Sequence, residues 1–186
     1  MSARRIVVAA MLAGLTLAMA PILSGHAPWL IWNASASVPI GLYGVEPDHR
    51  VDVGDLAVVM APEALAGFLA ERGYLPRSVP LLKHVLALGG QMVCRRGAVI
   101  IAHGKIYGNA LERDSRGRPL PAWQGCHVLA EGEVFLMNWA AADSFDGRYF
   151  GPLPTTSIVG RAVPIWTADR TFPAPDAFGE PARGEP

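Results

Sequence analysis

The chain has 186 residues, of which 51% are hydrophobic, and its 16 basic residues balance its 16 acidic ones. This length predicts one domain with short appendages, and zero net charge without a long basic run argues against a nucleic-acid partner held by charge. Sixteen prolines and 20 glycines favour many short strands and turns over a helix bundle.

The N-terminal residues 1–24 are expected to form a cytoplasmic tip and a transmembrane anchor. Two arginines precede an uncharged run, 6–23, and about 20 apolar residues are needed to cross the hydrocarbon core of a bilayer. The alternative is a cleaved signal peptide ending at Ala18-Met19-Ala20. Pro21 disfavours cleavage there, because proline lacks the N–H of an extended backbone. Either way, the remainder of the chain is expected outside the cytoplasm.

Residues 25–167 are expected to form a mostly β domain of antiparallel sheets with one short helix. The helix is predicted from Pro62 to Gly73, because proline favours the first helical position and glycine the end. Residues 109–125 are polar and rich in turns, which predicts an exposed loop, and 168–186 predict a disordered tail. Strands are predicted at 38–46, 55–60, 79–88, 92–95, 98–102, 105–107, 133–138 and 158–166.

Two cysteines, Cys94 and Cys126, occur without a CxxC pair. They are either two reduced thiols or, in an exported domain, one disulfide. No spacing of histidine and cysteine predicts a zinc site, and no other metal or cofactor is expected.

Lysine is rare in this chain: only Lys83 and Lys105 contribute to the 16 basic residues. Lys83 lies in the most apolar strand predicted for the domain. Burial lowers the pKa of a lysine and favours the neutral amine that a general base requires. Arginine cannot give up its proton in the same way, so a lysine kept in an apolar strand is a candidate for acid–base chemistry. The alternative is a lysine whose stem is buried and whose amine reaches water.

Three segments resemble the sequence boxes of the signal peptidase I clan, and most closely its TraF-type branch from conjugative transfer systems. The first is Ser37-Val38-Pro39, which continues as Ile40-Gly41-Leu42-Tyr43. The second is Lys83 with the apolar run that ends at Gly89-Gly90. The third runs from Asn138 to Gly151. Gln91 stands where the family has an aspartate, and Gly147 where it has a serine.

The resemblance implies a Ser–Lys endopeptidase with Ser37 as nucleophile and Lys83 as general base. It implies that the Ser37 N–H and the Ser35 hydroxyl bind the oxyanion, and that Ser144 orients the Lys83 amine. Asp146 and Arg148 would form a pair that braces the loop. The implied location is the bacterial inner membrane, single-pass, with the catalytic domain in the periplasm.

The implied partners are a pilin or another exported precursor polypeptide, the membrane, and components of a conjugative transfer system. Hydrolysis and peptide cyclisation both remain open as the final step. Two alternatives also remain: a general signal peptidase I with broad substrates, and a non-catalytic membrane-anchored assembly factor.

Overall fold

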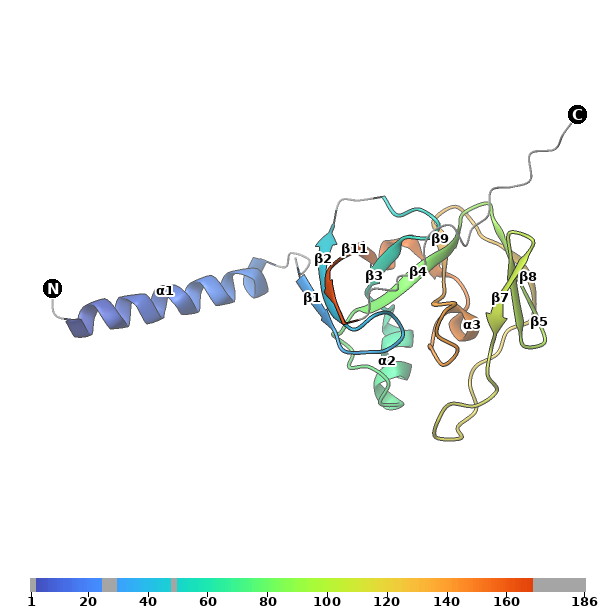
Figure 1. Ribbon diagram of the computed structural model, residues 1–186, viewed down its shortest axis with the longest axis horizontal. Coiled ribbons are helices and arrows are strands. Elements are labelled where there is room, and N and C mark those ends of the chain that lie inside the picture. Colours follow the sequence, from blue (N-terminus) through green and yellow to red (C-terminus); the bar gives the residue numbers. More distant parts are fainter. Residues whose placement is uncertain (1–2, 25–29, 48–49, 169–186) are drawn as a thin grey trace, which may run out of the picture.

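The computed structural model describes residues 3–24, 30–47 and 50–168, with the backbone alone at Ala3 and 17–24. Helix α1 (Ala3–Ser24) stands apart from the β domain (Figure 1). Among the residues described, no helix combines the length and the apolar character needed to cross a membrane. The tail expected at 168–186 lies outside the described residues except for its first position.

The domain consists of two antiparallel sheets and two further short helices, α2 (Glu63–Glu71) and α3 (Gly147–Phe150) (Figure 1). The larger sheet has the strand order β1 (Leu30–Asn33), β2 (Gly41–Glu46), β11 (Ile158–Thr167), β3 (Leu56–Val59), β4 (Leu81–Leu88), β9 (Glu133–Leu136) and β10 (Leu153–Pro154). The smaller sheet has the order β7 (Lys105–Asn109), β6 (Val99–Ala102), β5 (Met92–Arg96) and β8 (Gly125–Val128). A 3₁₀ turn (Thr155–Ser157) precedes β11.

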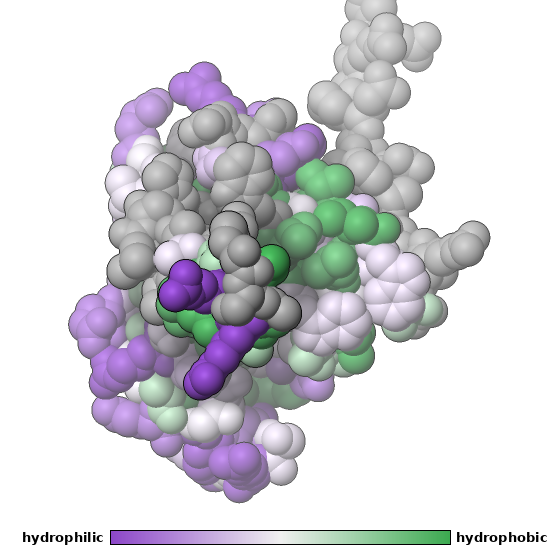
Figure 2. Space-filling model, turned by 90° about the vertical axis from the view of Figure 1, so that its left-hand side faces the viewer, coloured by the Kyte–Doolittle hydropathy of each residue, from purple (hydrophilic) through white to green (hydrophobic). Residues whose placement is uncertain are grey.

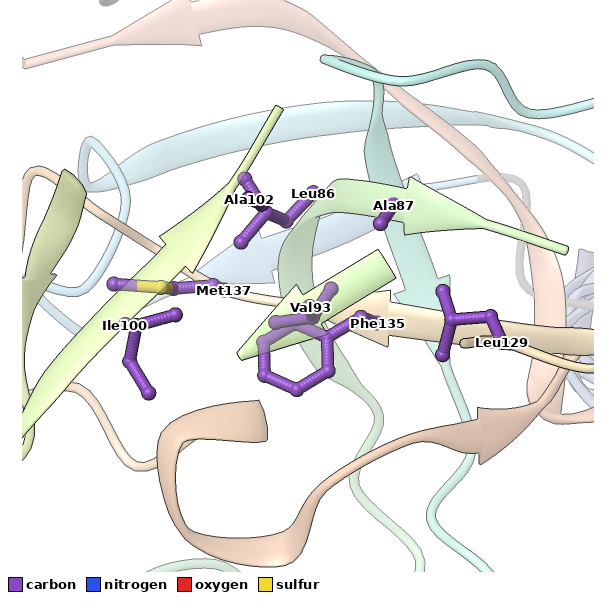
Figure 3. Packing of buried hydrophobic residues seen from close by; sticks show 8 residues of the cluster. All are labelled: Leu86, Ala87, Val93, Ile100, Ala102, Leu129, Phe135 and Met137. Carbon is purple, nitrogen blue, oxygen red and sulfur yellow. The ribbon is translucent and has the colours of Figure 1, made fainter. Parts of the chain in front are cut away.

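Apolar side chains from both sheets form the main core between them. Leu86 and Ala87 of β4 and Phe135 of β9 pack against Val93 of β5 and Ile100 of β6, and all five are fully buried (Figure 3). The smaller sheet therefore packs against the larger one at β4 and β9. Burial on this scale is the main favourable term in folding, so the position of β4 is fixed by the core.

The structure corrects several predicted boundaries. The strand expected at 38–46 begins only at Gly41, because residues 35–38 form a turn and Pro39 has no N–H for a sheet ladder. The strand expected at 133–138 ends at Leu136. The expected helix occurs as α2, and Gly73 follows it with a φ of +66°, a conformation that favours glycine.

Strands β1, β8 and β10 and helix α3 were not predicted. All four residues of β8 are exposed, so the strand lacks the alternation of apolar and polar residues that marks a half-buried strand. It is held instead by its pairing with β5, where Cys94 and Cys126 are directly opposite and form a disulfide. The structure thus contains the disulfide rather than two free thiols.

The loop after β7 is exposed, as predicted, but contacts hold it against the end of α2. Asp114 accepts hydrogen bonds from the Tyr74 hydroxyl (2.5 Å) and from Nε of Arg118 (2.7 Å). Arg72 donates to the carbonyl of Pro119 (2.9 Å). These bonds hold the loop along one side of the site described next.

Candidate active site

Ser37 lies in the turn between β1 and β2, and one buried side chain shapes that turn. The Asn33 amide donates to the carbonyls of Ser35 (2.8 Å), Val38 (3.1 Å) and Pro39 (3.1 Å). Its Oδ1 accepts the N–H of Ser35 (3.1 Å). Asn33 therefore ties down both ends of the turn, leaving Ser37 half-buried and Ser35 exposed.

The two serine hydroxyls of this turn contact each other. Ser35 Oγ and Ser37 Oγ are 3.2 Å apart, and Ser35 Oγ also donates to Asn33 Oδ1 (2.8 Å). Because a hydroxyl has one proton to give, Ser37 is the donor in the contact with Ser35. The Ser35 proton thus points to Asn33, and the Ser37 proton points to Ser35.

Lys83 lies in the middle of β4 and is buried, with 4% of its surface exposed. Its amine donates at 2.7 Å to the Oγ of Ser144, the residue that the family resemblance implies as its partner. Burial lowers the pKa of Lys83 from 10.5 to about 8, and the opposing attraction of Asp146 does not restore it. At pH 7 roughly a tenth of this amine is therefore neutral and able to accept a proton, far more than for an ordinary lysine.

Asp146 and Arg148 form an ion pair inside the domain, with exposed fractions of 0% and 1%. The guanidinium donates to both carboxylate oxygens at 2.9 Å. It also donates to carbonyls of the same loop, including those of Ala141 (2.6 Å) and Ser144 (3.2 Å). A buried ion pair needs such additional hydrogen bonds to offset the loss of hydration. The pair therefore fixes the backbone that carries Ser144.

Ser37 and Lys83 face a common cavity of about 460 Å³. Ser35 and Ser144 also line it, so the structure brings together four of the residues that the sequence singled out. Its other walls come from the end of α2, the loop held by Asp114 and the ring of Phe145. Among the described residues, no hydrogen bond joins Ser37 Oγ to Lys83 Nζ.

The two departures from the family boxes have local explanations. A Cβ at Gly147 would lie 2.6 Å from the carbonyl oxygen of Leu136 and 2.9 Å from the ring of Phe135, so the family's serine does not fit here. Gln91 accepts the N–H of Leu88 through its side chain (2.8 Å). It thereby closes the turn at Gly90, whose φ is +82°.

Two residues that support the site, Asn33 and Asn138, escaped the predicted set. Asn33 holds the serine turn, while Asn138 contacts His84 and the carbonyl of Leu82 in the strand of Lys83. His84 itself is buried against the Trp139 ring and does not line the cavity, as expected for a neighbour on the opposite face of the strand. The sequence did mark Asn138, because it opens the third box, but its position in the box did not predict a role.

Comparison with known proteins places these features in a family. A model described as signal peptidase, peptidase S26, matches residues 2–167. The conjugal transfer protein TraF of Agrobacterium fabrum is 35% identical over 180 residues, covering 91% of this chain and 99% of that protein. The plasmid transfer protein TraF of Escherichia coli is 32% identical over 145 residues, covering 73% and 81%.

Two more distant similarities also concern processing peptidases. The chloroplastic thylakoidal processing peptidase 1 of Arabidopsis thaliana is 29% identical over 117 residues, covering 62% of this chain and 32% of that protein. A crystal structure of a signal peptidase I from Enterococcus faecalis is 17% identical, with a TM-score of 0.37, and covers 61% of this chain and 97% of that one. Because the family model spans nearly the whole described chain, the protein belongs to the signal peptidase family, peptidase S26.

Proposed function

We propose that this protein is a serine endopeptidase that cleaves an exported precursor polypeptide with Ser37 and Lys83 as its catalytic dyad. The observation that carries the proposal is the buried Lys83 amine, which shares a cavity with the Ser37 hydroxyl and has a pKa lowered to about 8. A lysine in this state can act as a general base, whereas an ordinary surface lysine stays protonated.

In the proposed reaction, neutral Lys83 takes the proton of Ser37 as the hydroxyl oxygen attacks the scissile carbonyl. Collapse of the tetrahedral intermediate leaves an ester on Ser37, and the departing amine receives the proton from Lys83. Water then attacks the ester with Lys83 again as base, which releases the acid and restores the hydroxyl. Ser144 holds the amine in place throughout.

In this mechanism the Ser37 N–H and the Ser35 hydroxyl donate hydrogen bonds to the oxyanion of the tetrahedral intermediate. For this role the Ser35 hydroxyl has to rotate away from Asn33, and the Ser37 hydroxyl has to rotate from Ser35 toward Lys83. Both changes are rotations about one side-chain bond. Catalytic hydrogen bonds are often incomplete before substrate binds, so the resting arrangement is compatible with the proposed mechanism.

The test is cleavage of a pilin precursor, or another exported precursor encoded beside this protein, by the purified full chain in detergent. Ser37→Ala and Lys83→Ala should each abolish cleavage, while Lys105→Ala, which removes the other lysine, should not. Normal cleavage by folded Lys83→Ala would refute the dyad. If the unaltered protein binds the precursor but does not cleave it, the alternative of a non-catalytic assembly factor is favoured.

The substrate class is inferred from the relatives. Proteins named for conjugal or plasmid transfer cover most of this chain, which supports a role in a transfer system with a pilin or similar precursor as substrate. The alternative is a general signal peptidase I. Growth of a strain depleted of its own signal peptidase, rescued by this protein, would favour that alternative.

We also infer that the domain works at a membrane, outside the cytoplasm. The uncharged run 6–23 behind Arg4 and Arg5 supports an anchor, and the disulfide suits an oxidising compartment. Trp32 of β1 and Trp166 of β11 are exposed, and their rings are stacked 6.0 Å apart. Hydrophobic residues are exposed on the side of the molecule from which α1 extends (Figure 2). Protease protection in intact spheroplasts tests this orientation: a domain that stays protected would contradict it.

A further inference from the structure

The strand that carries Lys83 lacks a complete strand neighbour on one side. On the other side, β3 pairs with β4 along its first half, with Ala57 opposite Lys83. On the incomplete side, the pairing with β9 ends where Leu136 meets Val85. The backbone groups of β4 that flank Lys83 would there be buried without a strand to bond, and such groups are costly.

The side chain of Asn138 fills this gap. Its Nδ2 donates to the carbonyl of Leu82 (3.1 Å), and its Oδ1 accepts the N–H of His84 (3.0 Å). The same oxygen lies 3.1 Å from His84 Nδ1. One amide therefore bonds the residues immediately before and after Lys83.

Asn138 is itself held by the ion pair beneath the site. Its N–H donates to Asp146 Oδ2 (3.0 Å), and its carbonyl accepts from Arg148 Nη2 (3.4 Å). The loop that begins at Asn138 then carries Ser144, the partner of the Lys83 amine. Loop and strand are thus joined twice, once through the backbone beside Lys83 and once through its amine.

We propose that Asn138 is a positioning residue for Lys83. The side-chain amide of Asn138 replaces the missing strand neighbour and keeps the Lys83 amine shielded from water and in contact with Ser144. The inference rests on the proposed function only in treating Lys83 as the base. The plain alternative is that Asn138 merely satisfies two buried backbone groups and contributes stability alone.

The variant Asn138→Leu distinguishes these roles, because leucine has a similar volume and forms none of the three contacts. Without the amide, water has to reach the backbone on both sides of Lys83, and this water also hydrates the ammonium form. Burial is the main cause of the lowered Lys83 pKa, so its value should move from about 8 back toward 10.5. We expect a rise of about one unit, which lowers the neutral fraction about tenfold at neutral pH.

The matched control is Gln91→Leu, which removes a side-chain bond to the same strand at its far end, on the N–H of Leu88. The chain has only Lys83 and Lys105 as lysines, so full-length protein labelled with ¹³C,¹⁵N-lysine gives two side-chain signals for NMR titration. Lys105→Arg assigns them. This titration reads the state of Lys83 whether or not the protein is a peptidase.

A raised Lys83 pKa in Asn138→Leu and an unchanged one in Gln91→Leu would support the positioning role, together with a lower kcat at unchanged KM. An unchanged Lys83 pKa in folded Asn138→Leu, or an equal shift in both variants, would overturn it. If Asn138→Leu does not fold, Asn138→Asp replaces it: the carboxylate cannot donate to Leu82 and adds negative charge, so the same rise is expected. Absence of turnover in the unaltered protein would refute the proposed function and leave the titration to decide this inference.

Discussion

Replacing Lys83 with methionine should make the protein more stable at neutral pH while removing its proposed base. Both side chains are long and flexible, so methionine fills the buried site with little change in shape. In the unaltered protein the folded state has to keep an ammonium group where only 4% of the residue is exposed. Methionine removes that cost.

The magnitude follows from the pKa. The Lys83 pKa falls from 10.5 to about 8 on folding, and each unit is worth about 1.4 kcal/mol, so charging the buried amine costs roughly 3 kcal/mol. The variant also loses the hydrogen bond to Ser144 Oγ, and this loss cancels about 1 kcal/mol of the expected stabilisation. Lys83→Met should therefore raise the free energy of unfolding by about 2 kcal/mol near neutral pH.

The pH dependence has a definite sign. Because the folded pKa is lower than the unfolded one, the unfolded chain binds more protons between pH 8 and 10.5, and the unaltered protein gains stability as pH rises through that window. The advantage of methionine should accordingly shrink across the window, and above it the lost hydrogen bond should leave the variant about 1 kcal/mol less stable than the unaltered protein.

Urea unfolding followed by tryptophan fluorescence, at about pH 6.5 and about pH 10, measures both effects. Lys105→Met, on an exposed strand residue, is the control and should show no such dependence on pH. A methionine variant that is less stable at the lower pH, or whose stability difference is the same at both, would refute the assignment of a buried, hard-to-charge amine.

Other changes test the rest of the site. The kcat/KM for precursor cleavage should rise with pH and level off above the Lys83 pKa of about 8; a flat profile would argue against a lysine base. Arg148→Met leaves the buried Asp146 carboxylate without its counter-charge, and thermal unfolding should report a loss of about 3–5 kcal/mol. Gly147→Ser forces a Cβ to within 2.6 Å of a β9 carbonyl and should cost at least about 1–3 kcal/mol in urea unfolding; wild-type stability would contradict that packing. Cys94→Ser opens the disulfide that spans a sequence separation of 32 and should lower the free energy of unfolding by about 3–4 kcal/mol; unchanged stability would contradict the disulfide.

The strands that bury apolar residues were predictable from the chain alone. β4 appears as an apolar run broken only by Lys83 and His84, and the structure buries the strand, with Leu86 and Ala87 in the core between the two sheets. The edge strand β8 was not predictable, because its residues are exposed and its place depends on β5 and the disulfide. Core burial leaves a local pattern in the sequence, whereas edge pairing does not.

For the site, the sequence and its resemblance to the family predicted the candidate residues: a serine box, a lysine kept in an apolar strand, and a third box with Asp146 and Arg148. Only the tertiary structure decided that the ion pair is wholly buried rather than on the surface. It alone revealed that Asn138 bonds the strand of Lys83 across 54 and 56 residues of chain. The physical reason is that the pKa of Lys83 and the hydrogen bonds of its neighbours depend on what surrounds them in space. That environment is built by segments far apart in the sequence, so no local pattern records it.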